Sequence, residues 1–136
     1  MSERIYSIDN IKTALSPVLL KDGVWFMKNK IIIEKILKYI QKILSYADGF
    51  EYDEFVLNTM MVEACVFNLG QIGELANKID KDFEIRNSQI PWRVLYGLRN
   101  KIVHDYEGVN LSLIWEIIRT DLPELKKQLE ELYNEF

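Results

Sequence analysis

The stretch that decides the fold is IIIEKILKYIQKILSYA, residues 31–47. Its apolar residues recur every three or four positions, which is the spacing of one face of an α-helix. They are Ile32, Ile36, Ile40, Ile43 and Ala47, and Ile33, Leu37 and Leu44 widen the stripe. Asp48-Gly49 follows, and a glycine just past the last periodic residue is typical of a helix end. The stretch therefore predicts an amphipathic helix that packs against a core.

A second long helix is predicted from about Asn58 to Asp80, after a short segment over residues 52–57. Its apolar positions cover more than one face, so we expect a central helix. Asn68, Gly70 and Gly73 are small or short residues that would let another helix approach closely.

Two further helices are predicted in the C-terminal half. Residues 81–89 read as a polar connection, and Pro91 suits the first turn of a helix over about residues 91–105. Asn110 can cap a fourth helix, which Pro123 should kink or restart. Together the patterns predict an all-α fold, an up-and-down bundle of four or five helices.

The first 27 residues fit this pattern less well. We expect residues 1–27 to be an N-terminal extension and residues 28–136 to form the helical-bundle domain. Lys21-Asp22-Gly23 reads as a turn, and Val24-Trp25-Phe26 as a short apolar strand or a hydrophobic plug. Residues 8–20 could form one short amphipathic helix, broken or begun near Ser16-Pro17.

Composition narrows the class of protein. The chain has 136 residues, of which 49% are apolar, so one domain with a real core is expected. Cys65 is the single cysteine and lies in an apolar run, which fits a small core residue in a reducing cytoplasm. No apolar run approaches the roughly 20 residues of a membrane helix. The net charge of −4 counts against a broad nucleic-acid-binding surface, but not against a small site.

The chemistry is concentrated in RNKIVHDY, residues 99–106, which contains the only histidine. Only His titrates near neutral pH without a large environmental push, so His104 is the natural acid–base candidate. At about 100° per residue, Leu95, Leu98 and Ile102 form the core face of the third predicted helix. A sector of roughly 60° on the opposite side contains four residues. They are Arg93, Gly97, Asn100 and His104. This polar stripe could cradle a phosphate and its neighbouring hydroxyl.

Arg99 projects about 140° away from His104 on the same predicted helix. The two side chains do not share a face, and they could converge if Arg99 wraps round or if two copies of the helix meet across a dimer. The residues alone also permit a plainer interpretation. A single His on a polar helix face is most often just solvated, Arg99 a surface ion-pair residue, and Tyr106 an aromatic near a helix end. No zinc ligand set, Gly-rich phosphate loop or Ser nucleophile elbow is present.

The pattern Arg99-x4-His104-x-Tyr106 resembles the motif of the HepT-like toxins, a branch of the HEPN superfamily. Other blocks agree in type and order over about residues 28–134. They are Asn68-Leu69-Gly70-Gln71-Ile72-Gly73-Glu74-Leu75-Ala76, Ile90-Pro91-Trp92-Arg93, Gly97-Leu98-Arg99-Asn100, Ile114-Trp115 and Asp121-Leu122-Pro123-Glu124-Leu125. The resemblance implies a HEPN-like homodimeric bundle and the toxin of a type II/VII-like toxin–antitoxin pair. It further implies a cytoplasmic, metal-independent endoribonuclease that uses no cofactor and cleaves tRNA or mRNA.

The same resemblance implies roles for individual residues. His104 would act as general base or acid, Arg99 would neutralise charge on the phosphoryl oxygens, and Asn100 would orient the phosphate or the imidazole. We expect Arg93 and Lys101 to bind substrate. The usual partner is a nucleotidyltransferase antitoxin that, in some members, adds AMP to the motif tyrosine, which corresponds to Tyr106.

Two hypotheses stay open. The chain could instead be a non-catalytic HEPN protein that binds nucleotide or RNA and acts as partner of a nucleotidyltransferase. In addition, segments within residues 8–24 loosely resemble the opening of such nucleotidyltransferases, without the Gly-Ser and paired-Asp motif that should follow. Residues 1–27 are therefore interpreted as a degenerate remnant of a fused antitoxin or as an unrelated extension.

Overall fold

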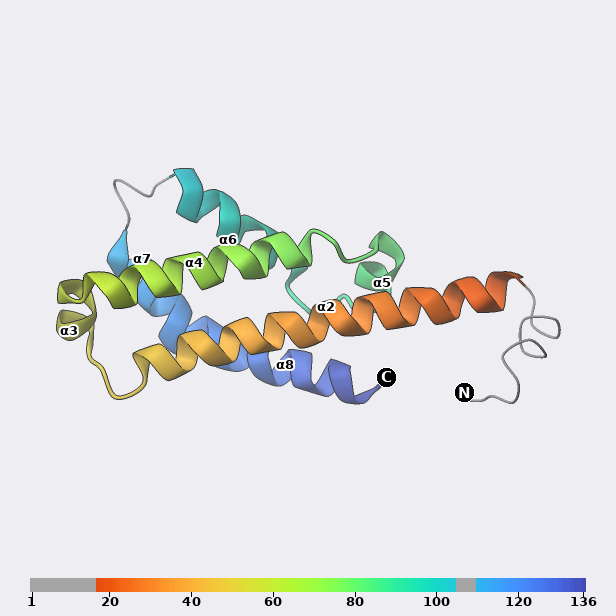
Figure 1. Cartoon of the computed structure of the whole chain (residues 1–136), viewed down its shortest axis with the longest axis horizontal. Helices are drawn as coiled ribbons and strands as arrows, with labels where there is room; N and C mark the ends of the chain where they lie inside the picture. The colour runs from red at the N-terminus through yellow and green to blue at the C-terminus, as the bar shows by residue number, and fades with distance from the viewer. Residues whose placement is uncertain (1–16, 105–109) are drawn as a thin grey trace.

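The computed structural model describes the backbone of residues 17–104 and 110–136, and the side chains of residues 26–98 and 110–136. Throughout these residues the regular structure is helical (Figure 1). The four longer helices are α2 (Pro17–Ala47), α4 (Thr59–Ala76), α6 (Trp92–His104) and α8 (Leu122–Asn134). Shorter elements are α3 (Tyr52–Leu57), α5 (Lys81–Arg86), α7 (Leu111–Glu116) and a π-helical turn (Ile117–Asp121). The expected all-α fold is confirmed.

Successive long helices alternate in direction, as in an up-and-down bundle (Figure 1). Helix α4 packs against α2 on one side and against α6 on the other, and α8 packs against α2. The expectation that the second long helix is central is therefore confirmed. None of the described helices combines the length and the apolar character that crossing a membrane requires.

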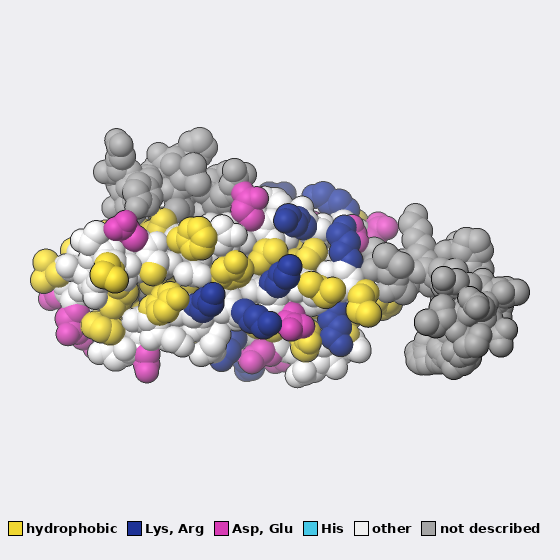
Figure 2. Space-filling view, viewed as in Figure 1, with side chains coloured by type: hydrophobic (Ala, Val, Ile, Leu, Met, Phe, Trp, Pro, Cys, Tyr) yellow, Lys and Arg dark blue, Asp and Glu magenta, His cyan; other side chains and the backbone are white. Residues whose placement is uncertain are grey.

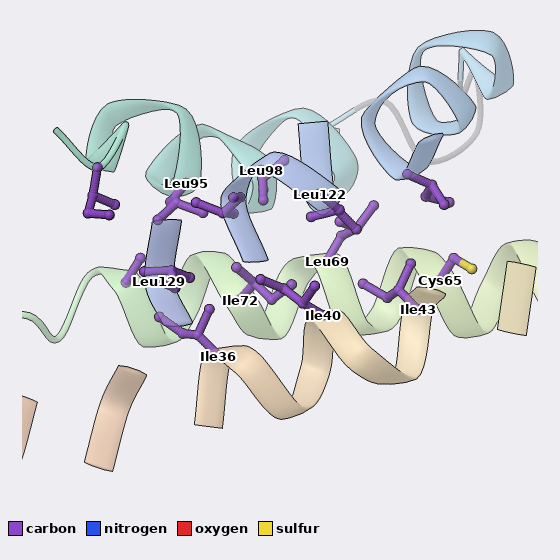
Figure 3. Close-up of a cluster of buried hydrophobic side chains, with 14 of the residues drawn as sticks. Ile36, Ile40, Ile43, Cys65, Leu69, Ile72, Leu95, Leu98, Leu122 and Leu129 are labelled. Carbon is purple, nitrogen blue, oxygen red and sulfur yellow. The ribbon is translucent and has the colours of Figure 1, made fainter. Parts of the chain in front are cut away.

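The core lies where the helical periodicity predicts it. Ile33, Ile36, Ile40 and Ile43 of α2 are completely buried. They meet apolar side chains from α4, α6 and α8, which point toward one another between the helices (Figure 3). Among these are Cys65, Leu69, Ile72, Leu95, Leu98, Leu122 and Leu129. Cys65 is fully buried, as its apolar surroundings in the sequence predict.

Helix ends also follow the predicted signals. Gly49 has a φ of +80°, a backbone conformation that glycine adopts without steric cost, two residues past the end of α2. The Asn110 side chain accepts a hydrogen bond from the backbone N–H of Leu113 at 3.2 Å and so caps α7. The chain restarts as α8 beside Pro123, which stands in its first turn, directly after the π-helical turn.

Two local expectations are wrong. Lys21-Asp22-Gly23 forms no turn and residues 24–26 form no strand, because α2 begins at Pro17 and runs through both without interruption. One isolated glycine costs a helix only about 1 kcal/mol relative to alanine, which a helix of 31 residues tolerates. The structure thus continues across the boundary between residues 27 and 28, and the division into two domains stays a prediction.

The polar connection predicted over residues 81–89 contains the short helix α5. Its Phe83 is buried and contacts Trp92, so one apolar residue fixes an otherwise polar segment to the core. Gly70 is also not needed for a close approach between helices of this chain, since an added Cβ atom would meet nothing within 4 Å. Asn68, in contrast, is buried, and its Nδ2 donates to the carbonyl oxygen of Ala64.

Candidate active site on helix α6

The first turn of α6 is held by a chain of contacts. The indole Nε1 of Trp92 donates to the carbonyl oxygen of Asn87 at 3.0 Å, and Asn87 Nδ2 donates to the carbonyl oxygen of Phe83 at 2.9 Å. The rings of Phe83 and Trp92 meet edge to face, with their centroids 6.1 Å apart. These contacts join the end of α5 to the start of α6 and fix the direction in which the motif helix leaves the core.

The two faces of α6 differ as predicted. Trp92, Leu95 and Leu98 are buried, and the helix packs against α4. Arg93 lies on the opposite side and is exposed, and Val94 next to it keeps 58% of its surface in solvent. The core face is therefore the one that sequence periodicity assigns, and the polar side of the helix looks outward.

The backbone of α6 stays helical as far as His104. At about 100° per residue, positions 100 and 104 fall on the same side as Arg93 and Gly97. The side chains of Arg99, Asn100, Lys101 and His104, and the whole of Tyr106, lie outside the described residues. The structure thus describes the helix on which five of the six candidate residues stand, and the roles of their side chains stay predictions.

A groove of about 720 Å³ runs beside this outer face of α6. Arg93 and Gly97 line it from α6, and most of the other lining residues are apolar. They include Val94, Leu98, Leu113, Ile117, Leu122 and Leu125. Because α7, the π-helical turn and α8 form the opposite wall, the groove brings together two segments that are separate in the sequence.

Sequence reasoning missed this groove. Leu122 and Leu125, which line it from α8, are also buried, and their place in the sequence does not reveal the groove. The π-helical turn over Ile117–Asp121 inserts an extra residue into the winding and therefore changes which residues face α6. Pro123 was the one available signal, and it predicts a break without predicting its shape.

Other titratable side chains of the core are poor candidates for chemistry. Burial raises the pKa of the Cys65 thiol to about 11, so the thiol stays protonated and unreactive at neutral pH. Within residues 26–98 and 110–136, no three His, Cys, Asp or Glu side chains come together in a way that could hold a metal ion.

Comparisons with known proteins agree with the motif. The family model described as "Ribonuclease HepT-like" matches residues 36–132, which include α6 and the whole motif. A protein of Caldanaerobacter subterraneus subsp. tengcongensis, named "Putative RNase TTE0752", is 35% identical over 74% of this chain and 89% of its own length. "Probable ribonuclease HepT" of Thermococcus cleftensis is 30% identical over 76% of this chain and 94% of its own length. No solved structure gives a significant match.

The family model covers well over half of the chain, and both relatives are aligned over most of their own length. The matched region begins inside α2 and ends inside α8, so it includes most of the helical core; Ile32 and Ile33 precede it. The chain therefore belongs to the HepT-like ribonuclease family.

Proposed function

We propose that the chain is a metal-independent endoribonuclease that acts as the toxin of a toxin–antitoxin pair. The observation that carries this proposal is the intact Arg99-x4-His104 pattern on the continuous helix α6, inside the region matched by the ribonuclease family model. The names of the relatives cited above support RNA as the substrate. We propose that the RNA it cleaves is a tRNA or an mRNA.

RNA carries its own nucleophile, because the 2′-hydroxyl can attack the adjacent phosphorus and expel the 5′-oxygen. In this mechanism His104 accepts the proton of the 2′-hydroxyl or donates one to the leaving oxygen. Arg99 neutralises the charge that grows on the phosphoryl oxygens, and its planar guanidinium can contact two of them. Asn100 orients the phosphate or the imidazole, and Arg93 and Lys101 bind the flanking phosphates.

The active form is proposed to be a homodimer. Arg99 and His104 are about 140° apart around α6, so a single helix does not present both to one phosphate. The apolar groove beside α6, with the exposed Val94 on its edge, is the kind of surface that a second copy would cover. In the proposed dimer, Arg99 of one protomer acts together with His104 of the other.

The cognate partner is proposed to be a nucleotidyltransferase antitoxin that attaches AMP to Tyr106. Tyr106 is two residues from His104 in the sequence. A nucleotide attached there would add bulk and a negative phosphate next to a site that binds phosphate, so it would exclude RNA by repulsion and by size. Residues 1–27 are proposed to be a degenerate remnant of such a partner.

A second candidate function is a non-catalytic protein that binds nucleotide or RNA as the partner of a nucleotidyltransferase. The observation that favours it is the net charge of −4, which counts against a broad surface for a polyanion such as RNA.

The test is expression in cells of the intact chain and of His104→Ala, with growth and the 3′ ends of cellular RNA as readouts. The catalytic proposal expects growth arrest and new RNA ends with the intact chain and neither with His104→Ala. Arg119→Ala, an exposed cation on the π-helical turn, is the matched control and should behave like the intact chain. Normal growth and no new RNA ends with the intact chain would support the non-catalytic partner instead.

A further inference from the structure

One face of α2 concentrates positive charge. Lysines 28, 35, 38 and 42 fall within a sector of about 100° together with Tyr39 and Tyr46. We call these six residues the α2 stripe. All four lysines and Tyr46 are exposed, and Tyr39 is half-buried. The stripe lies on the side of α2 that points away from the buried isoleucines, so the bundle itself does not explain it.

The charge of α2 is opposite to that of the whole chain. The helix contains six lysines, one aspartate and one glutamate, a net charge of +4, whereas the complete chain has a net charge of −4. On the face of the molecule shown in Figure 2, Lys and Arg side chains lie among hydrophobic ones. An acidic protein can therefore still present a local surface that attracts a polyanion.

Only part of this positive charge is neutralised within the chain. Lys28 Nζ lies 2.9 Å from Asp80 Oδ1, and Lys38 Nζ lies 3.5 Å from Glu34 Oε1. Lys42 Nζ stands 5.4 Å from the centroid of the Tyr39 ring. Neither Lys35 nor Lys42 forms an ion pair with a described carboxylate, so two cations remain available to an external anion.

Aromatic rings alternate with these cations. Tyr46 keeps 41% of its surface exposed at one end of the stripe, and Ile31, which is 45% exposed, lies between Lys28 and Lys35. Cations that contact phosphates, together with rings on which bases can stack, are the combination that sequence-independent RNA-binding surfaces use. Together with the proposed ribonuclease function, this combination favours RNA over an acidic protein as the ligand of the stripe.

We propose that the α2 stripe binds the backbone of the RNA substrate at a distance from the cleaved bond. This inference rests on the proposed ribonuclease function. Helix α4 lies between α2 and α6, so the stripe is separate from the motif helix. Lys28 and Lys42 are 14 residues apart, about 21 Å along the helix, which is long enough to contact several nucleotides. Only an RNA long enough to extend from α6 to α2 would use the stripe.

The test compares Lys35→Gln/Lys42→Gln with Lys126→Gln/Lys127→Gln, a control that removes the same charge from α8. Binding of an unstructured 30-nucleotide RNA is measured as a function of salt, in a His104→Ala background that prevents cleavage. We expect the stripe variant to bind about tenfold more weakly near 0.1 M salt. The negative slope of the logarithm of the association constant against the logarithm of salt concentration should become shallower by about 1.4. The control and Lys35→Arg/Lys42→Arg should bind like the parent.

Kinetics on the active chain give a second readout. The stripe variant should raise KM for the long RNA and leave kcat unchanged, and a tetranucleotide should be cleaved as by the parent. If the intact chain cleaves RNA and the stripe variant equals the α8 control in affinity, salt slope and KM, the inference fails and the ribonuclease proposal stands. If the intact chain neither binds nor cleaves RNA, both fail.

Discussion

Asn29 and Asp80 bind each other by two hydrogen bonds in opposite directions. Asn29 Nδ2 donates to Asp80 Oδ2 at 3.3 Å, and the backbone N–H of Asp80 donates to Asn29 Oδ1 at 3.4 Å. The Asn29 residue is completely buried, and Asp80 is the N-cap residue of α5. The pair therefore ties α2 to the segment that leads into the motif helix.

Replacing Asn29 by Ala should destabilise the protein by about 1 to 3 kcal/mol, because the backbone N–H and the carboxylate of Asp80 both lose a partner in a partly buried place. Chemical denaturation monitored by circular dichroism measures this loss. Lys28→Gln is the control, since it removes only the half-exposed ion pair to Asp80 and should cost less than about 1 kcal/mol. Equal effects of the two substitutions would contradict the role given to Asn29.

The buried Cys65 thiol predicts a specific loss of stability at high pH. Its pKa is raised from 9.0 to about 11 in the folded protein because burial disfavours the thiolate. Below pH 9 the thiol is protonated in both states and has no effect. As the pH rises from 9 to 11 the unfolded chain loses the proton first, so the free energy of unfolding should fall by about 2 to 3 kcal/mol.

Cys65→Ala isolates this effect from the titration of lysines and tyrosines. The variant should be less stable than the parent at pH 8, and the gap should shrink as the pH rises to 11. In parallel, an alkylating reagent at pH 8 should modify the native thiol far more slowly than the thiol of the urea-unfolded chain. A gap that stays constant with pH would argue against a raised pKa.

The sequence was sufficient for the long helices because their burial pattern repeats locally. Ile36, Ile40 and Leu95 were assigned to the core from spacing alone, and each is buried. The sequence was insufficient where a single tertiary contact decides whether a segment forms a helix. Phe83 organises a polar segment into α5 by contacting Trp92, and nothing near Phe83 in the sequence reveals that partner.

The candidate site, like the fold, could be predicted from the sequence only in part. Helical geometry places Arg93 on the side of α6 opposite Leu95 and Leu98. The structure confirms this, since Arg93 is exposed and both leucines are buried. The groove next to Arg93 depends on how α8 returns past α6, which no local pattern encodes. The lysine spacing of the α2 stripe was readable in the sequence, but its exposure depends on which face of α2 meets the other helices.

Tyr96, on α6, gives a prediction about an unused polar group. Its hydroxyl oxygen is buried and has no hydrogen-bond partner among the described residues, while Lys81 Nζ lies 5.7 Å from the ring centroid. Tyr96→Phe removes the unpaired hydroxyl and keeps the ring, so it should stabilise the fold by about 1 kcal/mol. Thermal unfolding measures the change, and a loss of stability would indicate that the hydroxyl does have a partner.

Glycine at position 97 is not required by the fold of one chain, but we expect it to be required for function. A Cβ atom added at Gly97 would meet nothing within 4 Å, although glycine weakens a helix by about 0.5 to 1 kcal/mol relative to alanine. The fold of one chain therefore does not require glycine on this outer face of α6. Gly97→Ala should raise the melting temperature by a few degrees, as should Gly70→Ala on α4, where the space is also open.

The two substitutions should differ in function. Gly97 lines the groove beside the motif helix, where the proposed second copy and the RNA approach, whereas Gly70 does not. Gly97→Ala should therefore reduce RNA cleavage, and analytical ultracentrifugation should show weaker self-association, while Gly70→Ala leaves both unchanged. Full cleavage and unchanged association by a stabilised Gly97→Ala would mean that neither a protomer nor RNA closely approaches this part of α6. The dimer would then have to form through a different face.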